Sequence, residues 1–350
     1  MTLRVARLVA GLTVVLMVTP AAVLAQAPPP AGSPVGDLAV MAGETLTLAG
    51  RSDHVSGNIT VEADATLAIS ASTVYMESDG AWISLAPGAT LRLTAGAAIK
   101  DSPTDMDDGS AADFAYSITA ASGASILLDG SSLEGANGVD AMDASIELRG
   151  SIVRMSGGPI TLAGMSMLYA VNSSFVQGVS PAVAALGTSQ AHVEGKGMPS
   201  YTVSPSARFS YSSFAAVTVR DSTAKPLGGA EWSFESTSGV VAGSAGQGGA
   251  LSTTRLDHEG FPSPIFALVP HLEDRGGSKT WAGVVARVKY AEWTDARVLD
   301  TSLDQFVNFT AMNRGFALSD ISEHAMLDNM GMHDMGMGDM GGMGAWEWAT

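Results

Sequence analysis

A five-residue motif recurs between residues 38 and 203, at a spacing that few folds can accommodate. It consists of a small residue, then Thr or Ser, then an apolar residue, any residue and a second apolar residue. Copies begin at Ala65, Ala89, Ala124, Ala144 and Met165, and a degenerate copy begins at Ser189. The first apolar positions are 67, 91, 126, 146, 167 and 191, so successive copies lie roughly 20 to 24 residues apart except for one step of 35, a period typical of repeat architectures. This spacing indicates a repeat protein, in which each unit buries its apolar face against its neighbours.

Each copy of the motif lies between two further short apolar segments. Ile59-Thr60-Val61 precedes the first copy, and residues 72–76 follow it. Three short strands in every repeat of this length, with Gly, Asn or Asp where the chain must turn, predict a parallel β-helix. An antiparallel β-sandwich is the alternative, but ordinary hairpins do not predict a unit of constant length. The sequence therefore predicts an all-β protein in which residues 38–203 form a parallel β-helix, or β-solenoid.

The one long step contains a polar, acidic stretch at residues 101–113. Without this stretch the step falls to 22, so we interpret it as a loop inserted into the β-helix. The loop holds Asp101, Asp105, Asp107, Asp108 and Asp113. Because Ca²⁺ binds about six to eight oxygen ligands, these carboxylates are a candidate calcium site. A solvated acidic loop that binds no cation is the alternative.

The N-terminus has the pattern of an export signal. Arg4 and Arg7 precede an apolar run over residues 8–18, and residues 23–25 fit the small-residue site before a cleavage. This pattern predicts a signal peptide over residues 1–25, a Pro-rich linker over 26–37, and a mature protein that is secreted or held at the cell envelope. An uncleaved membrane anchor is the alternative, although the run is shorter than the about 20 residues that span a bilayer. We expect no membrane span in the mature chain.

Composition restricts the partners of the chain. It contains no Cys, so no disulfide stabilises it, and charged residues make up only 15%. The net charge is −17, and the loss of Arg4 and Arg7 takes it to about −19. Because an acidic chain repels nucleic acid and anionic membranes, we expect neither as a partner.

The repeat region resembles the right-handed parallel β-helix repeats of secreted and surface proteins of bacteria and archaea. The family includes pectin-type lyases and hydrolases, and also proteins without known catalysis. An enzyme of this kind needs paired carboxylates, or a Ca²⁺ cage with a basic residue, at matching positions of successive turns. The charged residues that we place in strands are Glu62, Arg92, Glu147, Arg149, Arg154 and Glu194. They do not form such a set, so solvated outer-face residues are the favoured interpretation.

A second β domain is predicted over residues 204–314, after the apparent linker at residues 204–206. Its motifs are Val-x-Val-x-Asp at 217–221, Lys-Pro-Leu-x-Gly-Ala at 225–230 and Asp-x-x-Gly at 257–260. This order resembles the carboxypeptidase-regulatory-like module of carboxypeptidases and surface proteins. The resemblance implies a small Ig-like β-sandwich that acts as a spacer or docking unit without catalysis of its own.

Residues 315–350 form an acidic, Met-rich tail that is predicted to be disordered. Thioether sulfur is a soft ligand that suits Cu(I), and the Gly residues between the Met residues would let several sulfurs approach one ion. The candidate copper ligands are His324, Met326, Met330, Met332, His333, Met335, Met337, Met340 and Met343. The tail resembles the Met-rich motifs of exported copper-handling proteins. A low-complexity tail that binds no metal is the alternative.

The sequence contains no further catalytic pattern. None of its six His residues forms a zinc-type pair, and no Gly-x-Ser-x-Gly nucleophile elbow precedes a helix. Three sequons, at Asn58, Asn172 and Asn308, are candidate glycan acceptors.

We therefore expect a secreted or envelope-associated protein with a structural or adhesive role and no catalysis. Its β-helix face would contact a glycan or another surface protein. Two alternatives stay open. One is a carbohydrate-active enzyme, a polysaccharide lyase or hydrolase, on the same β-helix, and the other is extracellular copper handling through the tail.

Overall fold

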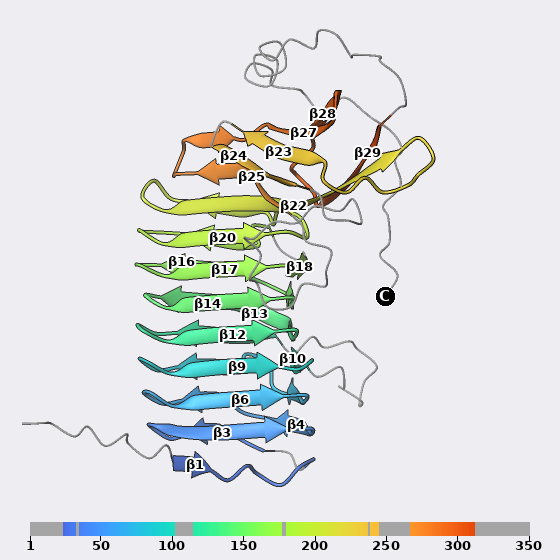
Figure 1. Cartoon of the computed structure of the whole chain (residues 1–350). Coiled ribbons are helices and arrows are strands. Elements are labelled where there is room, and N and C mark those ends of the chain that lie inside the picture. Colours follow the sequence, from blue (N-terminus) through green and yellow to red (C-terminus); the bar gives the residue numbers. More distant parts are fainter. Residues whose placement is uncertain are drawn as a thin grey trace, which may run out of the picture.

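Successive turns of the chain stack into a β-solenoid that carries further β-sheets at its C-terminal end (Figure 1). The computed structural model describes residues 24–32, 35–101, 115–176, 180–236, 239–244 and 267–311. Within these residues the regular elements are all β-strands, and no helix is long and apolar enough to cross a membrane. The solenoid has about seven turns over residues 38–212, which confirms the predicted parallel β-helix. Most of the predicted export signal, residues 1–23, lies outside the described residues.

Most turns of the solenoid contribute one short strand to each of three parallel faces; the second and third faces belong to one sheet, which β13 joins. The main face consists of β3 (Glu44–Ala49), β6 (Thr66–Ser70), β9 (Thr90–Thr94), β12 (Ser125–Asp129), β14 (Ser145–Arg149), β17 (Met167–Val171), β20 (Gln190–Glu194) and the first part of β22 (Arg208–Asp221), with β1 (Leu24–Gln26) paired to β3. The second face consists of β2 (Leu38–Val40), β5 (Ile59–Val61), β8 (Trp82–Leu85), β11 (Tyr116–Ala120), the second part of β13 (Ser132–Met142), β16 (Ile160–Ala163), β19 (Val183–Ala185) and β21 (Tyr201–Val203). The third face consists of β4 (Ser52–Val55), β7 (Thr73–Met76), β10 (Ala98–Asp101), the first part of β13, β15 (Ile152–Met155) and β18 (Ser174–Val176).

Residues at equivalent positions of successive turns lie directly above one another. On the main face Leu67 pairs with Leu91, and Leu91 pairs with Ile126. All three side chains point inward and are at most 1% exposed. Because side chains alternate between the two sides of a strand, the neighbouring residues form outward columns in the same register. The core is therefore shared between turns, and no single turn could bury its own apolar side chains.

The register of one repeat differs from the prediction. The motif predicted Met167 as the first inward residue of its strand, but in β17 Leu168 pairs with Ile146 and is buried, whereas Met167 is 56% exposed. Ser166 fills the buried position that Ala144 fills in the turn before. Its hydroxyl accepts the N–H of Ala144 (3.1 Å) and lies within hydrogen-bonding distance of two main-chain carbonyls. This buried serine takes the place of alanine, so the strand starts one residue later than the motif predicted. Every side chain of the strand therefore lies on the opposite face from the predicted one.

The inserted loop leaves the stacking of the turns intact. β10 ends at Asp101 and β11 begins at Tyr116, and both strands keep their parallel pairing with the turns on either side. Residues 102–114, between them, lie outside the described part of the chain. This pairing supports the interpretation of residues 101–113 as an insertion at a corner of the solenoid.

Buried serines satisfy main-chain groups at the corner between the main face and the third face. Ser131, Ser151 and Ser173 occupy equivalent positions there and are at most 4% exposed. The Ser151 hydroxyl donates to the carbonyl of Arg149 (2.8 Å) and accepts the N–H of Ser131 (3.2 Å). Ser173 accepts the N–H of Ser151 in the same way (3.1 Å). The hydroxyl column thus provides partners for main-chain groups that the turn would otherwise leave buried and unpaired.

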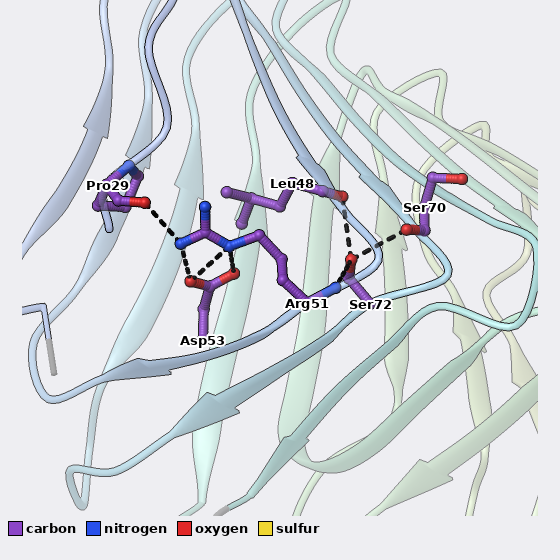
Figure 2. A network of polar contacts seen from close by, with 6 residues as sticks. All are labelled: Pro29, Leu48, Arg51, Asp53, Ser70 and Ser72. Carbon is purple, nitrogen blue, oxygen red and sulfur yellow. Dashed lines mark hydrogen bonds and ion pairs between the residues drawn. The ribbon is translucent and has the colours of Figure 1, made fainter. Parts of the chain in front are cut away.

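An ion pair closes the N-terminal end of the solenoid (Figure 2). Asp53 is 2% exposed and holds the inward position that Val74 fills in the next turn. Arg51 comes from the serine corner, and its main-chain N–H donates to Ser72 Oγ (3.1 Å). Its Nε donates to the Asp53 carboxylate oxygens (2.9 and 2.8 Å), and its Nη2 donates to the carbonyl of Pro29 (2.6 Å). The guanidinium therefore neutralises a buried carboxylate and ties the N-terminal segment to the first turn.

β22 runs without interruption from the solenoid into the C-terminal sheets. It pairs antiparallel with β25 (Ala267–Asp274), which is followed by β26 (Lys279–Trp281), and parallel with β29 (Gln305–Ala311). A second sheet consists of β24 (Gly239–Ser244), β23 (Glu231–Ser236), β27 (Val284–Tyr290) and β28 (Trp293–Leu299). Both sheets contribute to one core, in which Val217 and Phe309 from the first sheet share a cluster with Trp232 and Phe234 from the second. Residues 204–206, predicted as a linker, lie instead between β21 and β22 within the last turn of the solenoid.

The observed register makes Leu168 a core residue and Met167 a surface residue. We expect Leu168→Ala to lower the free energy of unfolding by about 2–5 kcal/mol, because it removes buried methyl groups and leaves a cavity. Met167→Ala, the matched control at the adjacent position, should change it by less than about 0.5 kcal/mol. Urea unfolding followed by circular dichroism measures both variants. The opposite order of effects would contradict the register.

The contributions of Arg51 and Asp53 to the stability of the first turn are expected to depend on each other. Asp53→Ala leaves a guanidinium buried without its carboxylate, which should cost about 3–5 kcal/mol. The double variant Arg51→Met/Asp53→Leu removes both charges and should recover most of that loss. Amide hydrogen exchange of β2 to β5 is the suitable measurement, since an end turn can open locally. Equal loss of protection in the two variants would show that the pair is not coupled.

Candidate functional site

Polar and aromatic side chains gather on the outer surface of the main face near the C-terminal end of the solenoid. They come from β14, β17, β20 and β22 and continue onto β25, so that their strands are neighbours in one sheet. Strands in such a sheet lie about 4.8 Å apart, which brings matching outward residues into contact. We call this set the polar strip; it consists of Glu147, Arg149, Tyr169, His192, Glu194, Arg208, Ser210 and Glu273.

His192 lies at the centre of the polar strip and connects three successive turns. Its ring stacks on that of Tyr169 in the preceding turn, with the ring centroids 5.6 Å apart and the planes at 4°. Its Nδ1 lies 2.7 Å from Ser210 Oγ in the following turn, and its Nε2 lies 2.7 Å from Glu194 Oε1 on its own strand. Both ring nitrogens therefore have a hydrogen-bond partner, and the position of the ring is fixed.

Glu194 is buried although its strand belongs to the outer surface. Only 4% of this residue is exposed. It interacts with His192 and also with the hydroxyl of Tyr169. The pKa of Tyr169 is raised well above its ordinary value, mainly by burial and secondly by the negative charge of Glu194. The phenol therefore stays protonated and can donate a hydrogen bond.

Arginine–carboxylate pairs flank the central residues of the polar strip. On one side Arg149 Nε donates to Glu147 Oε1 (2.7 Å). On the other side Arg208 Nη2 lies 2.6 Å from Glu273 Oε1, and Arg275 Nε donates to the same oxygen (2.7 Å). The hydrogen bond from Arg275, together with the charge of Arg208, lowers the pKa of Glu273 against the effect of burial, so this carboxylate is ionised at neutral pH. The strip thus offers an aromatic stack between two sets of fixed charges.

A second row of polar side chains follows the third face. The rings of His54 and Tyr75 stack with their centroids 5.1 Å apart, and Lys100 Nζ lies 3.2 Å from Glu134 Oε1. Burial alone would raise the pKa of Glu134, but hydrogen bonds from Lys100 and Ser132 lower it below its ordinary value. This row contains an aromatic stack like that of the polar strip, but His54 pairs with Glu77, a partially exposed carboxylate (2.5 Å).

The second face carries an open groove of about 470 Å³. Its outward residues are mainly small, with Ser84, Thr119 and Thr161 in one column and alanines beside them. Among the described residues that line the groove, Asp140 is the one charged residue and none is aromatic. The groove therefore has fewer groups that could recognise a ligand than the polar strip has.

Three of the charged residues identified in the sequence belong to the polar strip. Glu147, Arg149 and Glu194 were interpreted there as solvated side chains, but Glu194 is buried and hydrogen-bonded. Sequence reasoning did not find His192 or Ser210 as members of a site. The signal that could have found them is their spacing of 18 residues, close to one turn of the solenoid. Residues one turn apart face each other on neighbouring strands, so these two side chains meet once the register is known.

The predicted calcium site falls mostly outside the described residues. Asp105, Asp107, Asp108 and Asp113 are among residues 102–114, whereas Asp101 ends β10. The Asp101 carboxyl group packs against Gly135 of β13, where φ is +79° and a Cβ would lie 2.3 Å from Asp101 Cγ. Glycine at this position therefore allows the close approach, and the calcium site stays a prediction.

The predicted copper ligands also lie beyond the part of the chain that the structure describes. His324, His333 and the seven Met residues between 326 and 343 all follow residue 311, the last described one. In the described ranges no group of three or more His, Asp or Glu side chains could hold a metal ion. The copper site stays a prediction as well.

The three sequons lie at turns or on an exposed strand position. Asn58 precedes β5, and its Oδ1 accepts the N–H of Trp82 (3.1 Å). Asn172 follows β17 with a φ of 47°, and Asn308 is exposed in β29, where it contacts Thr218.

Comparison with known proteins gives no relative for this chain. No protein-family model, no curated protein and no solved structure matches it. The parallel β-solenoid is therefore established by its own strand pairing, and the resemblance of residues 217–260 to a carboxypeptidase-regulatory-like module stays a prediction.

Proposed function

We propose that this protein is exported and that it binds a glycan, or a glycan-bearing surface protein, through the polar strip. Its role in this proposal is structural or adhesive, at the cell surface or in the surrounding matrix. The observation that carries the proposal is the Tyr169–His192 stack with fixed charges on both sides. The export pattern of residues 1–25 supports a location outside the cytoplasm.

A sugar polymer is the ligand class that fits this chemistry best. Sugar rings have apolar faces that pack on aromatic rings, and hydroxyl groups that pair with ionised side chains in charge-assisted hydrogen bonds. Tyr169 and His192 supply the aromatic surface, and Arg149 lies at the side of the stack. An extended chain could follow the strip from turn to turn, because the binding groups lie in register along the solenoid axis.

The C-terminal sheets act as a rigid spacer or docking unit in this proposal. β22 belongs to both the solenoid and the C-terminal sheet, and β25 pairs with it across the junction. The motif order at residues 217–230 resembles the carboxypeptidase-regulatory-like module, and this likeness supports the proposed role. An Ig-like topology for the two sheets belongs to the same proposal.

Binding should depend on the aromatic stack of the polar strip. On an array of plant, bacterial and animal glycans, Tyr169→Ala should weaken binding about tenfold, because it removes the stacking surface. Tyr75→Ala is the matched control, since Tyr75 stacks on His54 in the same way on the third face. Equal effects of the two variants, or binding to no glycan at all, would contradict the proposal. Circular dichroism checks that both variants keep the fold.

Extracellular copper handling through the tail is a second candidate function. The observation that favours it is the concentration of seven Met and two His residues within positions 324–343. We expect the full chain to bind Cu(I) and a chain that ends at Arg314 to lose that binding; every described strand is retained in the shorter chain. Anaerobic competition with a colorimetric Cu(I) chelator measures the difference. Replacing Met330, Met332 and Met335 by Leu should weaken binding too, and equal affinity of all three proteins would exclude this function.

A further inference from the structure

Ser210, His192 and Glu194 have the relative arrangement of a nucleophile, a general base and the carboxylate that orients the base. Ser210 Oγ lies 2.7 Å from His192 Nδ1, and His192 Nε2 lies 2.7 Å from Glu194 Oε1. Both distances are within the range of hydrogen bonds. Such a constellation is recognised by its geometry and not by sequence order, and the three residues come from neighbouring strands β20 and β22.

The surroundings of the three residues hold them in the geometry that nucleophilic catalysis requires. Glu194 is 4% exposed, so its hydrogen bond to His192 is shielded from water. With the imidazole proton on Nε2 facing Glu194, the lone pair of Nδ1 points at Ser210 and can accept its hydroxyl proton. Tyr169 stacks on the ring from the other side and interacts with Glu194, which holds both members in place. Ser210 and His192 are only half-buried, so a ligand on the strip can reach them.

An ion-paired arginine lies on the same strand as the candidate nucleophile. Arg208 precedes Ser210 by two residues and faces the same side of β22. Its partner Glu273 is the residue that pairs with Ser210 across the sheet, so the Arg208–Glu273 ion pair lies on the same surface as the serine. A guanidinium at this place can stabilise the negative charge that develops on a carbonyl oxygen during nucleophilic attack.

We propose that the polar strip removes O-acyl groups, such as acetyl esters, from the glycan that it binds. The inference rests on the proposed glycan binding and adds an activity to it, in contrast to the non-catalytic role expected from the sequence. An ester is the substrate class that fits, because an alkoxide leaves more readily than an amide nitrogen. The site is an open strip, and Arg208 is the cationic group that we assign to the reaction.

The reaction is a two-step acyl transfer to water. Ser210 Oγ forms a bond to the acyl carbon while its proton passes to His192 Nδ1. The bond between the acyl carbon and the sugar oxygen breaks, and that oxygen takes the proton from His192. A water molecule then attacks the acyl-serine and gives one proton to His192, which returns it to Ser210 Oγ as the acyl group leaves. The products are a carboxylic acid and a free sugar hydroxyl.

Covalent labelling of Ser210 tests the nucleophile directly. We expect a fluorophosphonate probe to modify Ser210 in the full chain, as located by peptide mass spectrometry, and Ser210→Ala and His192→Gln to abolish the labelling. Ser145→Ala is the matched control, because Ser145 is an outward serine of the same face whose hydroxyl contacts Ser125 and no histidine. Its loss should leave labelling unchanged. Equal labelling of Ser210 and other exposed serines, or none at Ser210, would overturn the proposal.

Acetate release from an acetylated xylan, and hydrolysis of 4-nitrophenyl acetate, test the reaction. Ser210→Ala and His192→Gln should lower both rates by about 100-fold or more, and Glu194→Gln should lower them less. Ser210→Ala removes one half-buried hydroxyl, so it should keep the fold, which circular dichroism checks. Glycan binding without labelling or hydrolysis would overturn the esterase and leave the proposed function standing. Labelling of Ser210 without glycan binding would overturn the proposed function instead.

Discussion

In-register parallel pairing between successive turns is the interaction on which the rest of this structure depends. On the main face each strand pairs residue for residue with the equivalent strand of the next turn, so a position recurs along the solenoid axis. Inside, this places Leu67 against Leu91 and builds one continuous apolar core. Outside, the same register places Tyr169 against His192 and His192 against Ser210. The core and the candidate site are thus two consequences of one pairing rule.

The chain has no disulfide, and polar groups inside the solenoid take part in holding its corners and its end. Ser131, Ser151 and Ser173 form a column of hydroxyls that pairs main-chain groups at one corner. In the first turn the equivalent corner position holds Arg51, which neutralises the inward-facing Asp53 and binds the N-terminal segment. A buried ion pair is costly to form unless its remaining hydrogen bonds are satisfied, and here the carbonyl of Pro29 satisfies one of them. Polarity inside this fold is therefore concentrated where turns and ends leave main-chain groups unpaired.

The polar strip illustrates how a regular fold produces a specific site. Most outward columns carry small or hydroxyl-bearing residues, as Thr66 and Thr90 do on the main face. Near the C-terminal end three adjacent turns instead carry an aromatic residue, a histidine and a serine in one column, with a buried carboxylate beside them. β25 then pairs with the last solenoid strand and adds Glu273 to the same surface. The site depends on the junction with the C-terminal sheets as well as on the repeat.

The sequence by itself determined the three strands per turn, the regular step between copies of the motif, and the place of the inserted loop. These follow from local alternation of apolar residues and from turn residues, which need no knowledge of distant contacts. The register at Ser166 could not be predicted, because a serine buried by its hydrogen bonds is indistinguishable in a pattern from an exposed one.

Only the tertiary structure decided which outward residues form a site. Ser210 and His192 are 18 residues apart, and nothing in their local sequence distinguishes them from other surface side chains. The stacking of two turns brings them together, and the burial of Glu194 fixes the third partner. The predicted linker at residues 204–206 likewise lies within the last turn of the solenoid, and β22 continues from that turn into the C-terminal sheets. These features depend on contacts between turns, and a single sequence specifies such contacts only through the complete fold.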